Sequence, residues 1–291
     1  MLQDQHFDLL SLPIEALDPE DTTSAVRALI EGDATLTMFD YLLEPQGSDA
    51  TRTPELSSTL HAWTDGPLMR GFGPFRIIPR YLTDNLFFSY TYGFDFVLRL
   101  KQLGGWERVN QAYQDVPVST EQIIHPEKYL DQRDSPTSIH LPLLPESASG
   151  CQELEQNTLG ELNISILLDG YLPSNQARRA SAGWDGDRFS LYEDTETGHL
   201  LLAWYTIWDT EQEAQEFFHI CTAMLEKRYN LVSSSEESVP ASDQIPYVWN
   251  LDSGAVYLEL RGQDVLLLDG FSGQMLDEAI ALFWKSTLSE K

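Results

Sequence analysis

Residues 188–207 read Arg-Phe-Ser-Leu-Tyr-Glu-Asp-Thr-Glu-Thr-Gly-His-Leu-Leu-Leu-Ala-Trp-Tyr-Thr-Ile, and this stretch indicates the fold class. Residues 188–193 alternate between polar and apolar side chains, and residues 199–207 are mostly apolar. Thr197-Gly198 lies between the two runs, where a glycine suits a tight turn. The stretch therefore predicts a β-hairpin, and a hairpin implies an antiparallel sheet.

The segments around this hairpin have strand-like and helix-like patterns. Two further apolar runs, residues 254–260 and 264–269, flank residues 261–264 and predict another strand pair. Helices are predicted at residues 159–169, 174–182, 209–228 and 273–286, and Asp209 suits the N-cap of the third. Residues 231–243 read as a polar loop. This arrangement predicts an α+β domain with an antiparallel sheet.

The clearest helix of the first half is predicted at residues 18–43. Asp18 suits its N-cap and Pro19 its first turn. Apolar residues recur at spacings of three, four and seven and cover most of its circumference, so the helix is expected to be buried. Gly32 lies in the middle, where glycine costs about 1 kcal/mol relative to alanine. A glycine at such a position suggests that something approaches the backbone closely.

Glu31 precedes that glycine and is expected to point inward. It shares a helix face with Ala28, Ala34, Thr35 and Met38. A buried carboxylate needs a partner, and a metal ion or a histidine would serve.

The rest of the first half predicts further helices and a domain boundary. Residues 44–85 lack a strong period and read as a loop. A second buried helix is predicted at residues 86–104, ended by Gly104-Gly105, and a shorter one at residues 106–113. Residues 131–158 are polar and contain proline. We therefore expect a helical domain at residues 1–135, a linker at residues 136–158 and the α+β domain at residues 159–291.

Composition excludes some classes of function. The 291 residues include 46 acidic and 18 basic ones, which gives a net charge of −28. Nucleic-acid binding is excluded on this basis because phosphate contacts need clustered Lys and Arg. Cys151 and Cys221 do not have the spacing of a metal-binding pair, and sequence leaves their disulfide state open. No segment reaches the roughly 20 apolar residues of a membrane span. The first residues do not form a signal peptide, and an upstream export signal would place the protein outside the cytoplasm.

Several separated blocks of the sequence resemble one family. The first two blocks are residues 1–9, Met-Leu-Gln-Asp-Gln-His-Phe-Asp-Leu, and residues 28–34, Ala-Leu-Ile-Glu-Gly-Asp-Ala. Further blocks are residues 104–113, 119–129 and 183–188, with Trp208-Asp209 after them. In this order they resemble a bacterial and archaeal family of zinc metallopeptidases of the gluzincin type, over roughly residues 1–210. The chain departs from the family pattern at Asp185, where a small glycine is usual, and it lacks the family's His-Glu-x-x-His helix.

The resemblance implies a function and a set of site residues. In the intact parent protein, a helix directly before Met1 would supply two zinc-binding histidines and the glutamate that acts as general base. Glu31 would be the third zinc ligand, and Asp33 would orient a ligating histidine. His125, or else Tyr129, would donate a hydrogen bond to the oxyanion formed on a peptide substrate. This chain alone is expected to hold no zinc and to be inactive, since one carboxylate cannot hold the ion.

Other readings of the same residues remain open at this stage. Glu31 can be a buried acid paired with Arg or His, and Asp33 can be a cap or an ion-pair partner within the helices. His125 precedes Pro126 and can be a structural histidine bonded to a backbone carbonyl. For the whole chain, the alternative is a non-catalytic binding or surface protein that keeps the scaffold without the metal site. A third reading makes the α+β domain alone the functional unit.

Overall fold

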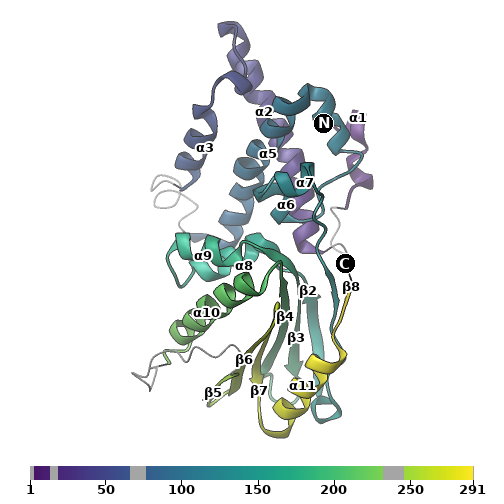
Figure 1. Cartoon of the computed structure of the whole chain (residues 1–291), viewed down its shortest axis with the longest axis vertical. Helices are drawn as coiled ribbons and strands as arrows, with labels where there is room; N and C mark the ends of the chain where they lie inside the picture. The colour runs from purple at the N-terminus through teal and green to yellow at the C-terminus, as the bar shows by residue number, and fades with distance from the viewer. Residues whose placement is uncertain (1–2, 14–18, 66–76, 232–245, 291) are drawn as a thin grey trace. The chain divides into compact units, whose positions relative to one another are not determined.

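The computed structural model describes residues 3–13, 19–65, 77–231 and 246–290 (Figure 1). The chain divides into two compact units, Met1–Asp134 and Ser135–Lys291, called here the N-terminal and C-terminal units. Helices form the first unit, and an antiparallel sheet with helices forms the second. The predicted α+β fold class is confirmed. None of the described helices is long and apolar enough to cross a membrane.

Two long helices dominate the N-terminal unit, α2 (Glu20–Leu43) and α5 (Arg80–Ala112). They cross with direct backbone contact, because a Cβ atom on Gly32 would lie 2.1 Å from the carbonyl oxygen of Gly93. The close approach that the sequence suggests at Gly32 is therefore present. The predicted break at Gly104-Gly105 is also present, since both residues have non-helical dihedral angles inside α5 and Gly105 has a φ of 65°.

Shorter elements complete this unit, and some of them correct the sequence-based expectation. Residues 44–85, expected to be a loop, contain α3 (Glu55–Asp65) and the beginning of α5. Leu56, Leu60 and Trp63 supply an apolar stripe along α3, and the surrounding Gly, Ser, Thr and Pro residues hide this pattern. The remaining elements are α1 (Asp4–Phe7), η1 (Leu9–Ser11), η2 (Glu44–Gln46), η3 (Ala50–Arg52), α6 (Thr120–Ile124) and α7 (Glu127–Leu130).

A six-stranded antiparallel sheet organises the C-terminal unit, with the strand order β2-β3-β4-β7-β6-β5. The predicted hairpin is β3 (Trp184–Asp194) and β4 (Leu200–Trp208), and the predicted second pair is β6 (Gly254–Arg261) and β7 (Asp264–Phe271). The edge strands are β2 (Cys151–Asn157) and β5 (Tyr247–Leu251). A separate pair joins β1 (Ser138–His140) to β8 (Leu288–Glu290), and a short 3-10 turn, η5 (Glu146–Ala148), precedes β2.

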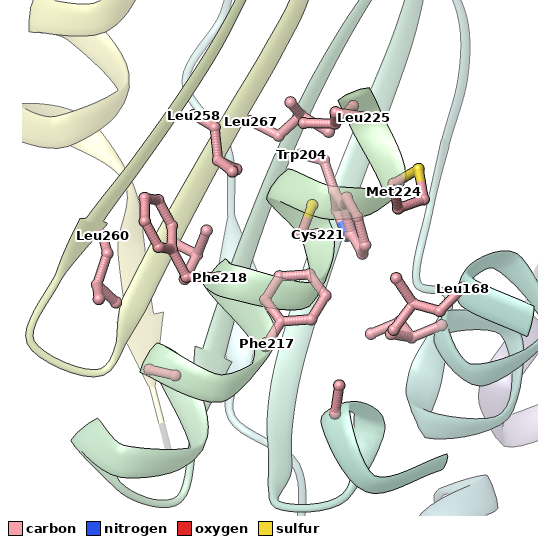
Figure 2. Close-up of a cluster of buried hydrophobic side chains, with 14 of the residues drawn as sticks. Leu168, Trp204, Phe217, Phe218, Cys221, Met224, Leu225, Leu258, Leu260 and Leu267 are labelled. Atoms are coloured by element: carbon pink, nitrogen blue, oxygen red, sulfur yellow. The ribbon is translucent and has the colours of Figure 1, made fainter. Parts of the chain in front are cut away.

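Helices cover both faces of this sheet and bury two apolar clusters. One face packs against α8 (Gly160–Asp169), α9 (Ser174–Ser181) and α10 (Glu211–Arg228), with Trp204 and Phe217 near the centre of the cluster (Figure 2). The other face packs against α11 (Gly273–Ser286) through Phe283 and its neighbours. Successive side chains of a strand point to opposite faces of the sheet, and here both faces are buried. Such a strand is apolar almost throughout, which explains the continuous apolar run in β4.

Three local expectations differ from the structure or lie outside its described part. Residues 151–157, expected to lie in a linker, form strand β2, which pairs with β3. Helix α10 is capped by Thr210 and not by Asp209. The Thr210 hydroxyl accepts a hydrogen bond from the Glu213 amide and donates one to the Glu213 carboxylate. The proposed cap Asp18 and most of the loop at 231–243 lie outside the described residues. Cys151 and Cys221 are free thiols.

Candidate functional site

Glu31, the predicted metal ligand, lies near the middle of α2 and is half-buried. The Tyr90 hydroxyl on α5 donates a hydrogen bond to its carboxylate. Burial, together with the charge of Glu31 and this bond, raises the pKa of Tyr90 above its usual value. This contact links the Glu31 carboxylate to α5.

The helix face around Glu31 is less buried than the sequence suggests. Ala28 and Thr35 are buried, but Ala34 is exposed and Met38 is 50% exposed. The expectation of an inward-pointing face is therefore wrong for the turns that follow Glu31. The physical reason is that α5 packs against the other side of α2, through Gly32 and Ala28.

Asp33, the predicted neighbour of the metal site, has a different set of partners. Its Oδ2 atom accepts hydrogen bonds from the Tyr113 hydroxyl at 2.8 Å and from the Gln3 amide at 2.8 Å. The same amide donates to the Ile30 carbonyl at 3.0 Å. Desolvation and the Asp33 charge raise the pKa of Tyr113 well above its usual range. These bonds place the first described residue of the chain on the turn of α2 that contains Glu31.

An apolar groove of about 630 Å³ lies beside this turn, between α2, α3 and α5. The described residues of its lining include no charged side chain, and Trp63 and Leu86 remain about half exposed at 55% and 46%. Tyr90 belongs to the lining and also contacts Glu31, so this one residue connects the groove to the carboxylate. The described lining residues are Ala34, Thr35, Met38, Phe39, Leu56, Thr59, Leu60, Trp63, Thr64, Leu86, Phe87 and Tyr90.

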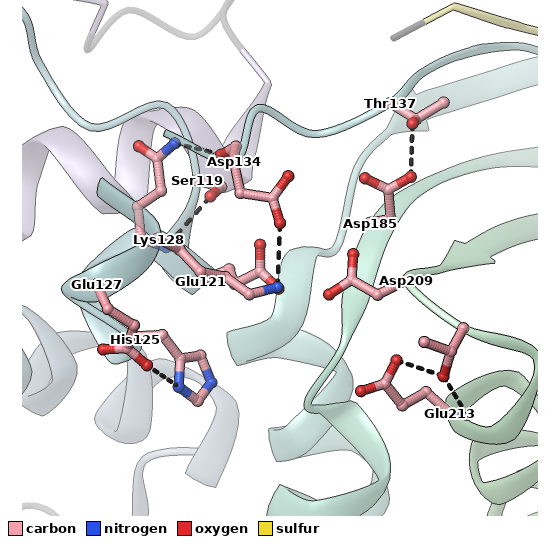
Figure 3. A network of polar contacts seen from close by, with 12 residues as sticks. Ser119, Glu121, His125, Glu127, Lys128, Asp134, Thr137, Asp185, Asp209 and Glu213 are labelled. Atoms are coloured by element: carbon pink, nitrogen blue, oxygen red, sulfur yellow. Dashed lines mark hydrogen bonds and ion pairs between the residues drawn. The ribbon is translucent and has the colours of Figure 1, made fainter. Parts of the chain in front are cut away.

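The predicted oxyanion donors lie near each other in the sequence: His125 follows α6 (Figure 3), and Tyr129 belongs to α7. The His125 ring is 3.8 Å from the Glu127 carboxylate, and its side chain is 31% exposed. The Tyr129 hydroxyl donates to the Asp115 carbonyl at 2.7 Å, so Tyr129 could act as a donor only if this bond broke. A position of His125 opposite Glu31 across a substrate stays a prediction.

Helix α6 is attached to the first turn of α2, and this attachment sets the distance between the α6 region and Glu31. The buried Asp21 carboxylate, in the first turn of α2, accepts a hydrogen bond from the Thr120 backbone amide at 3.1 Å. At 1.5 Å per residue, Glu31 lies about 15 Å further along α2. A peptide would have to span this distance to contact both Glu31 and the α6 region.

In the C-terminal unit, Asp187 is a fully buried acid whose role the sequence does not indicate. Its two carboxylate oxygens accept four hydrogen bonds, from the backbone amides of Leu159 and Gly160 and from the ring nitrogens of Trp184 and Trp204, at 2.9–3.0 Å. Burial raises its pKa, while these four donors favour the charged form. Because both carboxylate oxygens already accept hydrogen bonds from the beginning of α8 and from two strands, we assign Asp187 a structural role: it holds the beginning of α8 against the sheet.

A smaller pocket of about 190 Å³ lies between α8, α10 and the sheet. Among the described lining residues, Arg228 and Asp269 are charged and the others are apolar. The Tyr229 hydroxyl donates to the Asp269 carboxylate, and burial with this bond raises the pKa of Tyr229 to about 12. This contact ties the end of α10 to β7.

Comparisons with known proteins find one similarity. Residues 148–279, less than half of the chain, match a family described as a domain of unknown function (DUF8575). The match extends from just before β2 into α11 and so includes the six strands of the sheet. No curated protein and no solved structure is significantly similar to the chain.

Proposed function

We propose that the N-terminal unit is part of a gluzincin-type zinc metallopeptidase in which Glu31 binds the metal. The observation that supports this most directly is the contact of Gln3 with the Ile30 carbonyl and the Asp33 carboxylate. A segment that precedes Met1 would approach α2 beside Glu31. Residues 1–9 resemble the segment that directly follows a zinc-binding helix, and this resemblance requires the second histidine of that helix to lie beside Glu31.

The exposed face of α2 is a second support for the proposal. Positions 31, 34 and 38 follow one another at helical spacing, so their side chains lie on one face. Glu31 is half-buried there, and Ala34 and Met38 are exposed beside the apolar groove. A helix with an apolar face could cover Ala34 and Met38 and bring its histidines to the Glu31 carboxylate.

The residues present fit one part of a zinc site. A carboxylate oxygen is an ordinary zinc ligand, and two histidines with one glutamate leave a position for water. Bound zinc would supply a hydroxide-like nucleophile at neutral pH. Glu31 would contribute its negative charge, and the Tyr90 hydroxyl would orient the carboxylate in the way that outer hydrogen bonds orient metal ligands. The substrate class is then a peptide or protein chain.

A chain extended at its N-terminus tests the proposal. The extension should encode an amphipathic helix that ends in His-Glu-x-x-His directly before Met1. We expect this protein to retain one zinc ion per chain after dialysis against a weak chelator, whereas the unextended chain should retain none. Glu31→Gln should abolish retention, because an amide oxygen is a much weaker ligand than a carboxylate. Glu44→Gln, at the end of the same helix, is the matched control.

Two results would contradict the proposal. Chelator-resistant zinc in the unextended chain would place the metal elsewhere. Full zinc retention in the extended Glu31→Gln protein would remove Glu31 from the ligand set. Hydrolysis of a casein substrate by the extended protein, lost in Glu31→Gln, would establish the enzymatic part of the proposal.

A second candidate function is a non-catalytic binding protein. The uncharged groove favours it, because exposed apolar surfaces of this kind commonly mark interaction sites. An extended protein that retains no zinc, but in which hydrogen exchange around Trp63 and Met38 slows, would support this candidate over the peptidase.

A further inference from the structure

Gln3, near the start of the N-terminal unit, is held to the long helices by a small, partly buried network. The Gln3 amide donates to the Ile30 carbonyl at 3.0 Å and to Asp33 Oδ2 at 2.8 Å, and it lies 3.2 Å from the Tyr113 hydroxyl oxygen. The Tyr113 hydroxyl donates to the same Asp33 oxygen at 2.8 Å. A single carboxylate oxygen thus joins α1, α2 and the end of α5.

Ring stacking adds a second contact between the same elements. The Phe7 ring at the end of α1 lies parallel to the Tyr113 ring, with an interplanar angle of 2° and a centroid separation of 3.9 Å. Leu9 and Leu12, which follow α1, are buried as well. Polar and apolar contacts therefore hold both ends of this short helix, although its four residues are too few to be stable alone.

We propose that Asp33 and Tyr113 are positioning residues that hold Gln3 on the Glu31 turn of α2. In doing so they set where the backbone of Gln3 lies relative to Glu31. The metal part of this inference rests on the function proposed above. The Oδ2 atom of Asp33 accepts two hydrogen bonds within the chain, and a contact of Asp33 with a zinc-binding histidine, which the resemblance implied, stays a prediction.

Burial makes Asp33 the central member of the network. Asp33 is 7% exposed and Tyr113 is 6% exposed. Removing the Asp33 carboxylate leaves the Gln3 amide and the Tyr113 hydroxyl without this acceptor, and water has little access to replace it. Removing only the tyrosine hydroxyl leaves the bond between Gln3 and Asp33 intact and keeps the stacked ring. The effect of Asp33→Ala should therefore exceed that of Tyr113→Phe.

The first experiment uses the chain as it exists. Hydrogen exchange at residues 3–12 should accelerate at least about tenfold in Asp33→Ala and less in Tyr113→Phe, because the native contacts of α1 are lost. Asp33→Asn keeps an oxygen that can accept both bonds, so it should restore slow exchange in part. Asp40→Asn is the matched control on the same helix, since Asp40 bonds to the Ala50 amide and to Lys101 instead.

The second experiment measures zinc affinity in the extended chain. Asp33→Ala should weaken zinc binding by about 10- to 100-fold, the usual effect of losing a group that orients metal ligands. Asp33→Asn should recover part of the affinity, and Asp40→Asn should leave it unchanged. Far-ultraviolet circular dichroism of each variant establishes that α2 and α5 remain folded.

The possible outcomes separate this inference from the proposed function. Unchanged exchange at residues 3–12 in Asp33→Ala would overturn the network itself. Faster exchange with unchanged zinc affinity would overturn the positioning role while leaving the zinc site in place. An extended parent chain that binds no zinc would overturn the proposed function and the metal part of this inference together.

Discussion

Substituting Gly32 by alanine tests the helix crossing that positions Glu31 and Asp33. A Cβ atom at this position would lie 2.1 Å from the Gly93 carbonyl oxygen and 2.2 Å from its carbon. Ordinary contact begins at 3.4 Å, so α2 and α5 would have to separate by about 1.3 Å. The obstacle is backbone, which cannot rotate away as a side chain can.

The expected cost follows from two opposing effects. Overpacking of this kind destabilises by about 1–3 kcal/mol, and backbone contact places Gly32→Ala at the upper end. Alanine regains about 1 kcal/mol because it favours the helical backbone over glycine. We therefore expect a net loss of about 2 kcal/mol in the free energy of unfolding of the N-terminal unit. Gly93→Ala should behave alike, since its Cβ would lie 2.2 Å from the Ala28 carbonyl oxygen.

The assay must report on the N-terminal unit, because the chain divides into two compact units. Hydrogen exchange followed by mass spectrometry gives the opening free energy of peptides within α2 and α5. Thr37→Ala on the exposed side of α2 is the control and should be neutral or slightly stabilising. A Gly32→Ala protein as stable as the wild type would refute the close crossing. In that case the positions that we give for Glu31 and Asp33 relative to α5 would be wrong as well.

Three further predictions concern the C-terminal unit and the whole chain. Asp187→Asn should lower the free energy of unfolding of the C-terminal unit by about 3 kcal/mol in urea, because an amide cannot accept all four hydrogen bonds. The exposed Asp252→Asn is the control and should have no effect. Equal losses in the two variants would refute the role assigned to Asp187. Stability should fall as pH rises above about 10, since the folded chain keeps the proton on Tyr229, whose pKa is raised to about 12 from 10.0, while the unfolded chain loses it. Urea midpoints at about pH 8 and pH 10.5 measure this, and Tyr229→Phe should reduce the difference. The melting temperature should rise between about 0.1 M and 2 M KCl, because salt screens the repulsion among the excess acidic side chains that give the net charge of −28. An unchanged or lower melting temperature would contradict this.

Much of the fold follows from local patterns in the sequence. The apolar period of residues 18–43 matches α2, and Gly104-Gly105 divides α5 where the sequence indicates. Gly32 is informative because a poor helix former in a strong helix needs a reason, and the reason is the backbone of Gly93. Such features depend on a residue and its near neighbours, so sequence alone can reveal them.

The elements that the sequence does not indicate have weak local patterns. Strand β2 has the sequence Cys-Gln-Glu-Leu-Glu-Gln-Asn, and its side chains are mostly exposed. An edge strand of this kind is defined by its pairing with β3 and not by its own side chains. The cap of α10 is a different case, because the sequence does contain its signal: Thr210 and Glu213 have the spacing of a capping box.

The polar networks depend on partners that are distant in the sequence. Asp33 lies two residues from Glu31, so its nearness to the candidate ligand is visible in the sequence. Its hydrogen-bond partners lie 30 and 80 residues away, at Gln3 and Tyr113. No periodicity relates these three positions, because they meet only where α1 and the end of α5 both contact one turn of α2. The helix crossing at Gly32 places that turn against α5, and for this reason one glycine substitution should disturb the ligand candidate, its tyrosine partner and the Gln3 contact together.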